Sequence, residues 1–546
     1  MSLRPRSVPD IPEETARIAK SVFSNGNPYM TMRDKLGTFF KDDQFCDLYP
    51  GEGQLAFSPW RLALVCVMQF AENLTDRQAA NAVRARIDWK YALSLELEDE
   101  GFDYSILCEF RQRLLTSDDA DRLLNSMLTH FQDAKLLKAR GKQRTDSTHM
   151  LAAARLLNRL EHIGETLHYA LNQIAACDQE WLKNWVAPSW FDRYGRSFQE
   201  YRLPTKDSER NELAVTIGYD GFALLNTVIN DNQTPQYIRD LDAIEILRQT
   251  WVQQYYFDDD ILCWRTPKEL PPCGIRIQSP YETDARYCTK RSVAWVGYKV
   301  HLTETCDDDS PNLITHVETT ASTVQDVEVV NDIHADLEEL ECLPGQHIAD
   351  MGYSSAGLFV DSQNNYGINL IAPVRDDRSW QFREGTGFDI AHFQIDWEKK
   401  KAICPMGKIS SSWTPCPPRQ GYDVIFIKFR APDCRVCTAK KVCTRAKRRT
   451  ISVQTQEVYE IIKQKRLFQQ SDEYYEIYRK RAGVEGTVSH AAWTLGMRRS
   501  RYRGKDKTHL QSIFTAAAIN LTRVVNWLTE KPRSETRVAR FATLAA

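Results

Sequence analysis

Hydrophobic residues recur with helical spacing along the first quarter of the chain, after an opening stretch, residues 1–55, that we expect to be partly irregular. In the segment FSPWRLALVCVMQFAENLTDRQAANAVRARIDWKYALSL, Ser58 followed by proline is typical of a helix start. Thr75 and Gln78 form a capping-box pattern for a second helix, which follows a short break at Asn73. This spacing fits a helix–turn–helix unit that reads DNA, and it fits a plain helical bundle equally well.

The hydrophobic pattern changes twice farther along the chain. Helix is expected to continue to about Ala139, and the stretch LAAARLLNRLEHIGETLHYALNQIAA at the start of residues 151–285 again has a strong helical period. Beyond Ser292, the runs VAWVGYKVHLTET and LITHVETTAST alternate and are rich in β-branched and aromatic residues, so they predict two strands. A short helix in VQDVEVVNDIHADLEEL and strands in GQHIADMGYSS and GINLIAPV follow. With a first strand at residues 145–150, this order predicts a mixed α/β sheet.

Composition and charge narrow the class of protein. The chain has 546 residues, of which 42% are hydrophobic and 26% charged, as is typical of a soluble globular protein with several cores. The opening MSLRPRSVPDIPEET lacks the apolar core of a signal peptide, and the apolar run at residues 62–68 is too short to span a bilayer, so we expect a cytoplasmic protein. The net charge is −2, but residues 430–546 hold 25 Lys and Arg against 10 Asp and Glu. That basic part is expected to meet a polyanion, and a solvated basic face is the alternative.

Three acidic residues are candidates for a shared metal site. Asp146 in RTDSTHM and Asp350 in HIADMGYSS stand at or near the ends of predicted strands, where two carboxylates can share a hard divalent cation such as Mg²⁺. Glu485 in YRKRAGVEGTVSH is the candidate third carboxylate, because a helix places it on one face with Tyr478 and Arg481. Two bound ions would activate an attacking oxygen and stabilise a leaving one, while the arginines bind phosphates. Glycines on both sides of the glutamate remove side-chain bulk, so that a backbone can approach closely.

Each of these residues also has a plainer interpretation. A single Asp after a strand is commonly a turn or cap residue, and Arg481 with Glu485 makes an ordinary i,i+4 ion pair on a helix surface. The hypothesis therefore depends on the three acids together. Asp146 and Asp350 are 204 residues apart, which predicts that the helical segment 151–285 is an insertion after the first strand. The gap of 135 residues between Asp350 and Glu485 contains a cluster of cysteines.

Several of these motifs together resemble a known family. TDSTHM, ADMGYSS and Tyr478-x2-Arg481-x3-Glu485 resemble the motifs of DDE transposases from bacterial insertion sequences. The wider stretches CTKRSVAWVGYKVHLTET and RLLNRLEHIGETL resemble the eleven-eighty-two group in particular, and the resemblance runs from about residue 57 to residue 527. It implies an RNase H-like core, Mg²⁺ or Mn²⁺ as cofactor, cleavage at the terminal inverted repeats of an element, and strand transfer into target DNA. The acidic triad that it implies is Asp146, Asp350 and Glu485.

One position departs from the wider family signature, which often has a lysine seven residues after the glutamate, where this chain has Ala492. We expect contacts to double-stranded DNA from Arg498, Arg499 or Arg501 in GMRRSRYRGKDK instead, beside those of Tyr478 and Arg481. The N-terminal helices and the basic C-terminal strip are the segments expected to read DNA ends.

The resemblance leaves more than one function to consider. Because the reaction joins two DNA ends, we expect a homo-oligomer on DNA. The resemblance also implies a bacterial cytoplasmic protein that associates with the nucleoid. An inactive, transposase-derived DNA-binding protein is one alternative, although an intact triad argues against it. A related nuclease that cuts without joining is the other.

Five of the 14 cysteines crowd between residues 404 and 443, and the other nine are scattered, which does not suggest a disulfide scaffold. Cys434-x2-Cys437 has the spacing of a zinc knuckle, and Cys443 and Cys404 complete a four-thiolate site for zinc. Cys416 competes with Cys404 as the fourth ligand, and reduced free thiols are the plainer alternative. The cluster is surrounded by basic residues that suit a phosphate backbone, namely Lys440, Lys441, Arg445, Lys447, Arg448 and Arg449.

These observations predict an α/β protein with an RNase H-like mixed-sheet catalytic core and several additions. The expected divisions are an N-terminal helical, DNA-binding domain (1–139), the core (140–150 and 286–375), a mainly helical insertion (151–285), a cysteine-rich zinc insertion (376–450), a completion of the core with the catalytic helix (451–530) and a basic tail (531–546).

Overall fold

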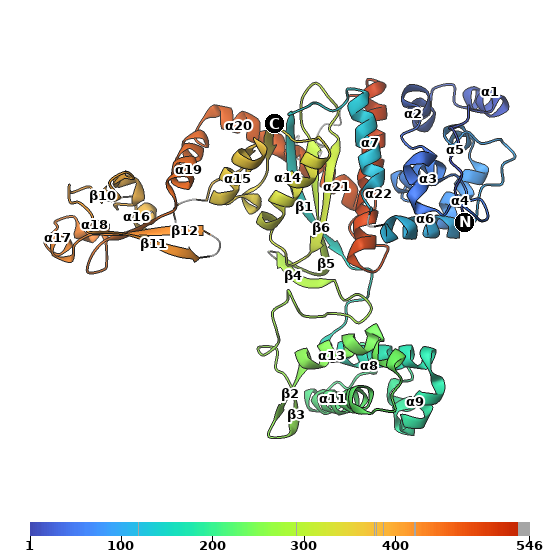
Figure 1. Cartoon of the computed structure of the whole chain (residues 1–546), viewed down its shortest axis with the longest axis horizontal. Coiled ribbons are helices and arrows are strands. Elements are labelled where there is room, and N and C mark those ends of the chain that lie inside the picture. Colours follow the sequence, from blue (N-terminus) through green and yellow to red (C-terminus); the bar gives the residue numbers. More distant parts are fainter. Residues whose placement is uncertain are drawn as a thin grey trace, which may run out of the picture.

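The computed structural model describes residues 1–532 except 118, 291, 376, 378, 386, 420 and 421. Three lobes surround a central sheet (Figure 1): helices from the N-terminal part lie along one side, a mainly helical lobe projects below, and a narrow β-rich arm extends from the other side. The predicted basic tail at 531–546 falls almost wholly outside the described residues.

The central sheet is built around β1, with strands in the order β4-β5-β1-β7-β8 and β6 also paired with β5. β1 is antiparallel to β5 and parallel to β7, so the sheet is mixed. The runs predicted as strands are strands, and the mixed α/β arrangement is consistent with the RNase H-like core that the resemblance implies. The bounds are β1 (Lys142–Leu151), β4 (Arg286–Lys290), β5 (Val293–Thr305), β6 (Ile314–Ala321), β7 (Gln346–Ile348) and β8 (Asn369–Ile371).

Helices cover both faces of this sheet (Figure 1). Side chains alternate between faces along a strand, so the even-numbered residues of β1 and their partners on β5 share one face. On that face Met150, Tyr298 and Val300 join the apolar core with α21 (Ala482–Trp493) and α22 (Lys505–Leu528). The opposite face packs against α14 (Val330–Glu339) and α15 (Ala356–Tyr366), where a second core contains Ile333, Tyr353 and Leu370.

The N-terminal helices share the largest apolar core with the sheet and α22. α3 is buried over nearly its whole length, and Phe70 at its end packs against Phe514 of α22, with ring centroids 5.3 Å apart. The predicted capping box is present, because Thr75 accepts a hydrogen bond from the Gln78 amide and Gln78 accepts one from the Thr75 amide. Within the described part of the chain no helix, α3 included, combines the length and the apolar character needed to cross a membrane. The bounds are α1 (Glu13–Val22), α2 (Pro28–Leu36), α3 (Pro59–Ala71), α4 (Asp76–Ala85), α5 (Ile87–Ala92), α6 (Ser105–Thr116) and α7 (Arg122–Asp133).

The last of these helices, α7, ends earlier than the hydrophobic pattern predicts. Lys135 has a left-handed backbone (φ 56°), which breaks the helix, and the Leu136 amide turns back to donate to the Phe131 carbonyl. Leu136 is therefore part of the core although it lies after the end of the helix. The hydrophobic period alone does not tell a buried residue in a helix from one in the turn that follows it.

The segment predicted as a helical insertion forms a lobe with its own core around Leu167, Trp190 and Trp251. Both of its ends meet the sheet at Gly297 of β5, which pairs with Leu151 on one side and with Arg286 on the other. Gly297 has φ +153°, and a Cβ there would lie 2.1 Å from the Met150 carbonyl oxygen, so only glycine fits. The lobe contains α8 (Arg159–Cys177), α9 (Gln179–Trp185), α10 (Pro188–Tyr194), α11 (Asp207–Asn230), α12 (Gln236–Arg239), α13 (Asp242–Gln254), β2 (Tyr255–Asp258) and β3 (Ile261–Trp264).

The β-rich arm also has its own core, in which Phe393, Phe429 and Ile451 are buried. Two helices connect it back to the sheet, α19 (Gln456–Phe468) and α20 (Asp472–Tyr478). The arm contains α16 (Trp380–Arg383), β9 (Gln394–Asp396), β10 (Lys401–Ile403), β11 (Ser412–Arg419), β12 (Tyr422–Lys428), α17 (Ala431–Arg435), α18 (Lys440–Cys443) and β13 (Thr450–Val453).

A buried amide fastens α22 to the edge of the sheet. Asn520 is fully buried, and its side chain accepts from the Ile314 amide (2.7 Å) and donates to the Ile314 carbonyl (2.8 Å).

Replacing Asn520 by Leu, of similar volume, leaves both backbone groups unpaired, so we expect the free energy of unfolding to fall by about 2–4 kcal/mol in urea titrations. Thr522→Val is the control, because Thr522 bonds only within its own helix. Equal urea midpoints for Asn520→Leu and the wild type would contradict this role.

Candidate active site

The pairing of β1 with β7 brings Asp146 and Asp350 together. The parallel register ends with Arg144 opposite Ile348, and each aspartate lies two residues beyond that pair. Side chains two residues apart lie on the same face of a strand, so both carboxylates face the side covered by α21. Their proximity also appears in their electrostatics, because the charge of Asp350 contributes to raising the pKa of Asp146.

The third predicted acid, Glu485, lies in the first turn of α21 and reaches Asp146 through one arginine. Arg481 donates to Asp146 Oδ2 (3.2 Å) and forms an ion pair with Glu485 Oε1. The side chains of Asp146 and Arg481 are 17% and 19% exposed, whereas that of Glu485 is 58% exposed. The structure thus joins two of the three predicted acids through a guanidinium, and the third predicted acid, Asp350, is near Asp146.

Three details differ from the expectations or refine them. Asp146 lies in the middle of β1 and not at its end, because β1 continues past the point where β7 stops. Asp350 does act as a cap, accepting from the Gly352 amide (2.7 Å) through one oxygen. Tyr478 and Glu485 are not on one unbroken α-helix, since a 3-10 turn at Arg479–Arg481 separates α20 from α21. Two of the plainer interpretations therefore hold as well: Arg481 and Glu485 form an i,i+4 ion pair, and Asp350 caps a turn.

Burial raises the pKa of the Asp146 carboxyl, while the Ser147 amide (2.8 Å) and Arg481 oppose this shift. Burial likewise raises the pKa of the Tyr478 phenol, with the nearby Arg481 lowering it and Asp350 raising it again. The Asp146 carboxyl is therefore held where water is partly excluded, and Arg481 is the cation that pairs with it.

The donor set of three carboxylates fits a hard divalent cation. Of the described residues, only His316, Glu318 and Asp336 bring three metal-ligating atoms within 4.8 Å of one another. The three predicted carboxylates are therefore farther apart, with Arg481 between two of them. A cation held by Asp146 and Glu485 has to compete with this guanidinium.

A fourth carboxylate, Asp326, lies beside the site and was not predicted. It pairs with Lys299 (3.0 Å) and accepts from the Ser147 hydroxyl (3.4 Å), next to Asp146. A Cβ at Gly352 would lie 2.9 Å from Asp350 Oδ1 and 3.0 Å from Asp326 Oδ2, so the two acids flank this glycine. Asp326 could have been found in the same way as the other two aspartates, because it also follows soon after a predicted strand.

The predicted DNA-contacting arginines have different surroundings. Arg498 donates to the Thr148 hydroxyl (3.1 Å) and packs over Trp493, and Arg499 is exposed. Arg501 donates to the Leu74 carbonyl (2.8 Å), so its guanidinium fastens the C-terminal strip to the N-terminal helices. Ala492, at the place of the family's lysine, is buried.

Four of the five clustered cysteines line one cavity of about 220 Å³ in the arm, namely Cys404, Cys434, Cys437 and Cys443. The Lys408 amide donates to Cys404 Sγ (3.3 Å) and the Arg449 amide to Cys434 Sγ (3.4 Å). Burial raises the pKa of the Cys443 thiol, Arg449 lowers it, and the other three thiols raise it further. Cys416 lies on β11, outside this cavity.

Comparison with known protein families identifies two segments. Residues 403–525, which contain the cysteine cluster, Glu485 and most of α22, match the family described as "Transposase DDE domain". Residues 18–113, which run from within α1 to within α6, match the family described as "Transposase domain (DUF772)". No curated protein matches the chain.

The two family matches indicate a DNA transposase. More particularly, the matches over residues 18–113 and 403–525 support a DDE transposase of an insertion sequence. The matches do not assign it to the eleven-eighty-two group or to any other group.

The raised pKa of Asp146 means that its ionised form costs stability. The folded state holds this proton more tightly than the unfolded chain, so folding stability from this residue is lost as the pH rises past the ordinary Asp range, about 4, and through the raised pKa. We expect Asp146→Asn, whose side-chain oxygen can still accept from the Ser147 amide, to unfold at a higher temperature than the wild type at pH 7 without divalent cations. The difference should vanish below about pH 3.5.

The matched control is Asp192→Asn, at an exposed position on α10. A lower unfolding temperature for Asp146→Asn at pH 7 would show instead that the pairing with Arg481 outweighs the burial of Asp146.

Proposed function

We propose that this transposase cuts DNA at the ends of its element and joins them to target DNA, using Asp146, Asp350 and Glu485 as an RNase H-like acidic triad. The observation that carries the proposal is that Arg481 joins Asp146 of β1 to Glu485 of α21, while Asp350, just beyond β7, lies near Asp146. The match to a transposase DDE domain over the segment that contains Glu485 supports it.

The triad would hold Mg²⁺ or Mn²⁺, which supplies Lewis-acid activation of water or a 3′-hydroxyl and stabilises the leaving oxygen in phosphoryl transfer. Asp146 and Asp350 are fixed by strand pairing and by the Gly352 amide, so their oxygens are preorganised. Arg481 neutralises two of the acids, and its release from Glu485 would leave a guanidinium directed at a scissile phosphate.

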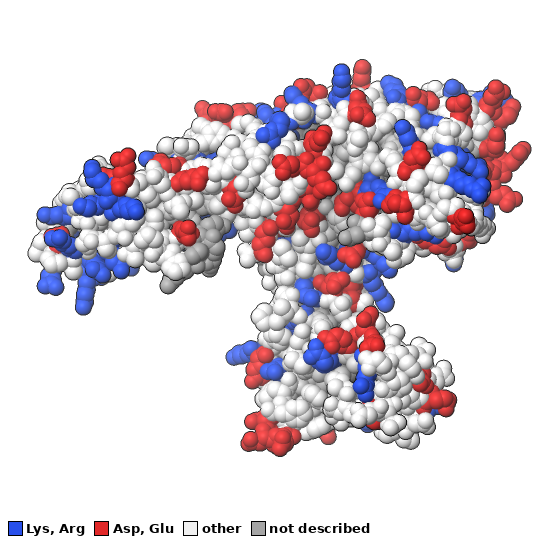
Figure 2. Space-filling model, in the orientation of Figure 1, with Lys and Arg blue, Asp and Glu red and all other residues white. Residues whose placement is uncertain are grey.

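Two surfaces are proposed to bind double-stranded DNA. The exposed side of α4 carries Arg77, Gln78 and Arg84 within the segment that matches the second transposase family. The far end of the arm gathers Lys and Arg (Figure 2), whereas acidic side chains gather over the central part of that view. The exposed basic residues that follow the first knuckle cysteine, Cys434, include Arg435, Lys441, Arg445, Lys447 and Arg448. Cutting two ends and joining them to a target favours a homo-oligomer on DNA.

Zinc is proposed to hold the basic end of the arm together. Four cysteines around one small cavity offer the donor type of a structural zinc site, and backbone amides donate to two of their sulfurs. No three of these four described sulfurs lie within 4.8 Å of one another, so zinc binding would draw them closer together. The position of Cys416 on β11 favours Cys404 as the fourth ligand. The arm would then present its basic residues on a fixed scaffold.

The transposase proposal is tested with Glu485→Gln on labelled DNA from the two flanks of the gene, in the presence of Mg²⁺. We expect the wild type to cut and join this DNA, and the variant to bind it while cutting at least ~100-fold more slowly, because an amide is a poor substitute for a carboxylate ligand.

Glu473→Gln, at an exposed position on α20, removes the same charge and should behave as the wild type. Binding without cutting by the wild type would indicate an inactive DNA-binding protein, and cutting without joining would indicate a nuclease. Equal cutting by Glu485→Gln and the wild type would remove Glu485 from the triad.

For the arm, we expect about one zinc ion per chain by elemental analysis of protein purified under reducing conditions. Cys437→Ser should lower the zinc content and increase the rate at which the remaining cysteines react with a thiol reagent. Cys416→Ser should keep the zinc of the wild type. A wild-type protein that contains no zinc after growth with added zinc would contradict the proposal.

A further inference from the structure

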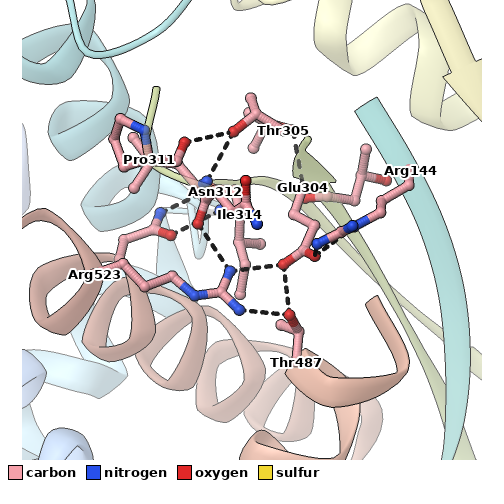
Figure 3. Close-up of polar contacts among 12 residues, drawn as sticks. Arg144, Glu304, Thr305, Pro311, Asn312, Ile314, Thr487 and Arg523 are labelled. Atoms are coloured by element: carbon pink, nitrogen blue, oxygen red, sulfur yellow. Dashed lines mark hydrogen bonds and ion pairs between the residues drawn. The ribbon is translucent and has the colours of Figure 1, made fainter. Parts of the chain in front are cut away.

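A fully buried glutamate lies behind the candidate active site. Glu304 is on β5, on the face that α21 and α22 cover, and its side chain is 0% exposed. Two arginines surround its carboxylate: Arg144 of β1 contacts Oε1 (2.6 Å) and Arg523 of α22 contacts Oε2 (2.6 Å). The hydroxyl of Thr487 on α21 also donates to Oε2 (2.6 Å), as Figure 3 shows. One carboxylate thus connects two strands and two helices.

The partners of Glu304 are neighbours of the triad in the sequence. Arg144 is two residues before Asp146 on the same face of β1, and Thr487 is two residues after Glu485 on α21. Arg144 also donates to the carbonyl oxygen of Lys480, immediately before Arg481. The network therefore holds α21 on both sides of Glu485 and ties it to the strand that carries Asp146.

One glycine of the basic stretch around Glu485 belongs to this network. A Cβ at Gly483 would lie 2.2 Å from Arg144 Nη1, so a larger residue would push the guanidinium away from the helix. Gly486, on the other side of Glu485, has nothing within 4 Å of such a position. The two glycines therefore differ: the first makes room for Arg144, and the second borders open space.

Stability alone does not account for this arrangement. Two guanidinium groups and a carboxylate lose most of their hydration here, and well-packed apolar residues often stabilise a core as well as a buried ion pair does. The ionic network instead fixes the positions of the strands and helices that it connects, because a fully hydrogen-bonded carboxylate holds its partners at set distances. A catalytic group displaced by about 1 Å can cost 100-fold in rate, so such fixing has a direct use beside a metal site.

We propose that Glu304 is a positioning residue, which sets the separation of Glu485 from Asp146 through Thr487 and Arg144. The inference rests on the proposed function, because it assigns a role in metal-dependent cutting. Glu304 itself does not touch the DNA or the metal. Its effect is to hold α21 against β1, so that Glu485 stays on the side of the sheet that carries Asp146.

The test removes one hydroxyl from the network. Thr487→Val keeps the shape of the side chain but cannot donate to Glu304 or accept from Arg523. We expect DNA cutting to slow by about 10- to 100-fold and the Mg²⁺ concentration for half-maximal cutting to rise several-fold, with DNA affinity unchanged. Thr487→Ser restores the hydroxyl and should restore both values. The control is Thr494→Val, at an exposed position at the end of the same helix.

The shift in Mg²⁺ requirement is the decisive measurement, because a general loss of folded protein lowers the amount of cutting without changing that concentration. A Thr487→Val protein with wild-type rate and wild-type Mg²⁺ requirement overturns the proposal. If Thr487→Val does not fold, Gly483→Ala replaces it, since the added Cβ displaces Arg144 from the surface of α21. Its control is Ser489→Ala, at an exposed position on the same helix.

Gly483→Ala is expected to raise the Mg²⁺ requirement, and an unchanged requirement overturns the proposal. A wild-type protein that does not cut DNA with Mg²⁺ contradicts the proposed function itself. The two failures are therefore distinguishable, because the second is visible before any variant is compared.

Discussion

The pairing of β1 with β5 on one side and β7 on the other is the constraint on which the rest of the structure depends. The antiparallel ladder with β5 extends along almost all of β1, whereas the parallel ladder with β7 ends at Arg144. This difference in length creates the site, since β1 continues past the end of β7 and leaves Asp146 and Asp350 side by side on one face. The N-terminal helices lead into β1, the helical lobe follows it, and α21 packs on it. A shift of β1 by one residue would turn Asp146 to the other face of the sheet and separate it from Arg481.

Much of the fold could be predicted from the sequence where the pattern was local. The strands β5 and β6 follow from alternation, the start of α4 from Thr75 and Gln78, and the contact of Arg481 with Glu485 from their spacing on a helix. The bounds of β1 could not be predicted, because its sequence KQRTDSTHML is polar and shows no alternation. Its side chains instead make buried polar contacts, such as that of Thr145 with His347 (2.6 Å).

The candidate site was predicted in part for the same reason. The three candidate acids could be proposed from motifs, but the residues that surround them in the structure could not. Glu304 reads as an ordinary polar residue near the end of a strand, and its partners Arg144 and Thr487 are 160 and 183 residues away in the sequence. No local pattern distinguishes a buried glutamate with two arginines from an exposed one. The choice between Cys404 and Cys416 likewise depends on which of them lines the cavity, which the sequence does not show.

The position of Gly297 has a consequence for how this chain could diversify. The lobe leaves the sheet after Leu151 of β1 and rejoins it at Arg286 of β4, and both of these residues pair with Gly297 of β5. The two ends of the lobe are therefore only two strand spacings apart, about 10 Å. The lobe therefore joins two nearby points of the sheet, as a short loop would. The entropic cost of bringing its two ends together grows only with the logarithm of its length. Because the lobe has its own apolar core, it can be enlarged, trimmed or exchanged while the register around Gly297 stays the same. The chemistry of the enzyme and the shape of its largest appendage are therefore free to evolve at different rates.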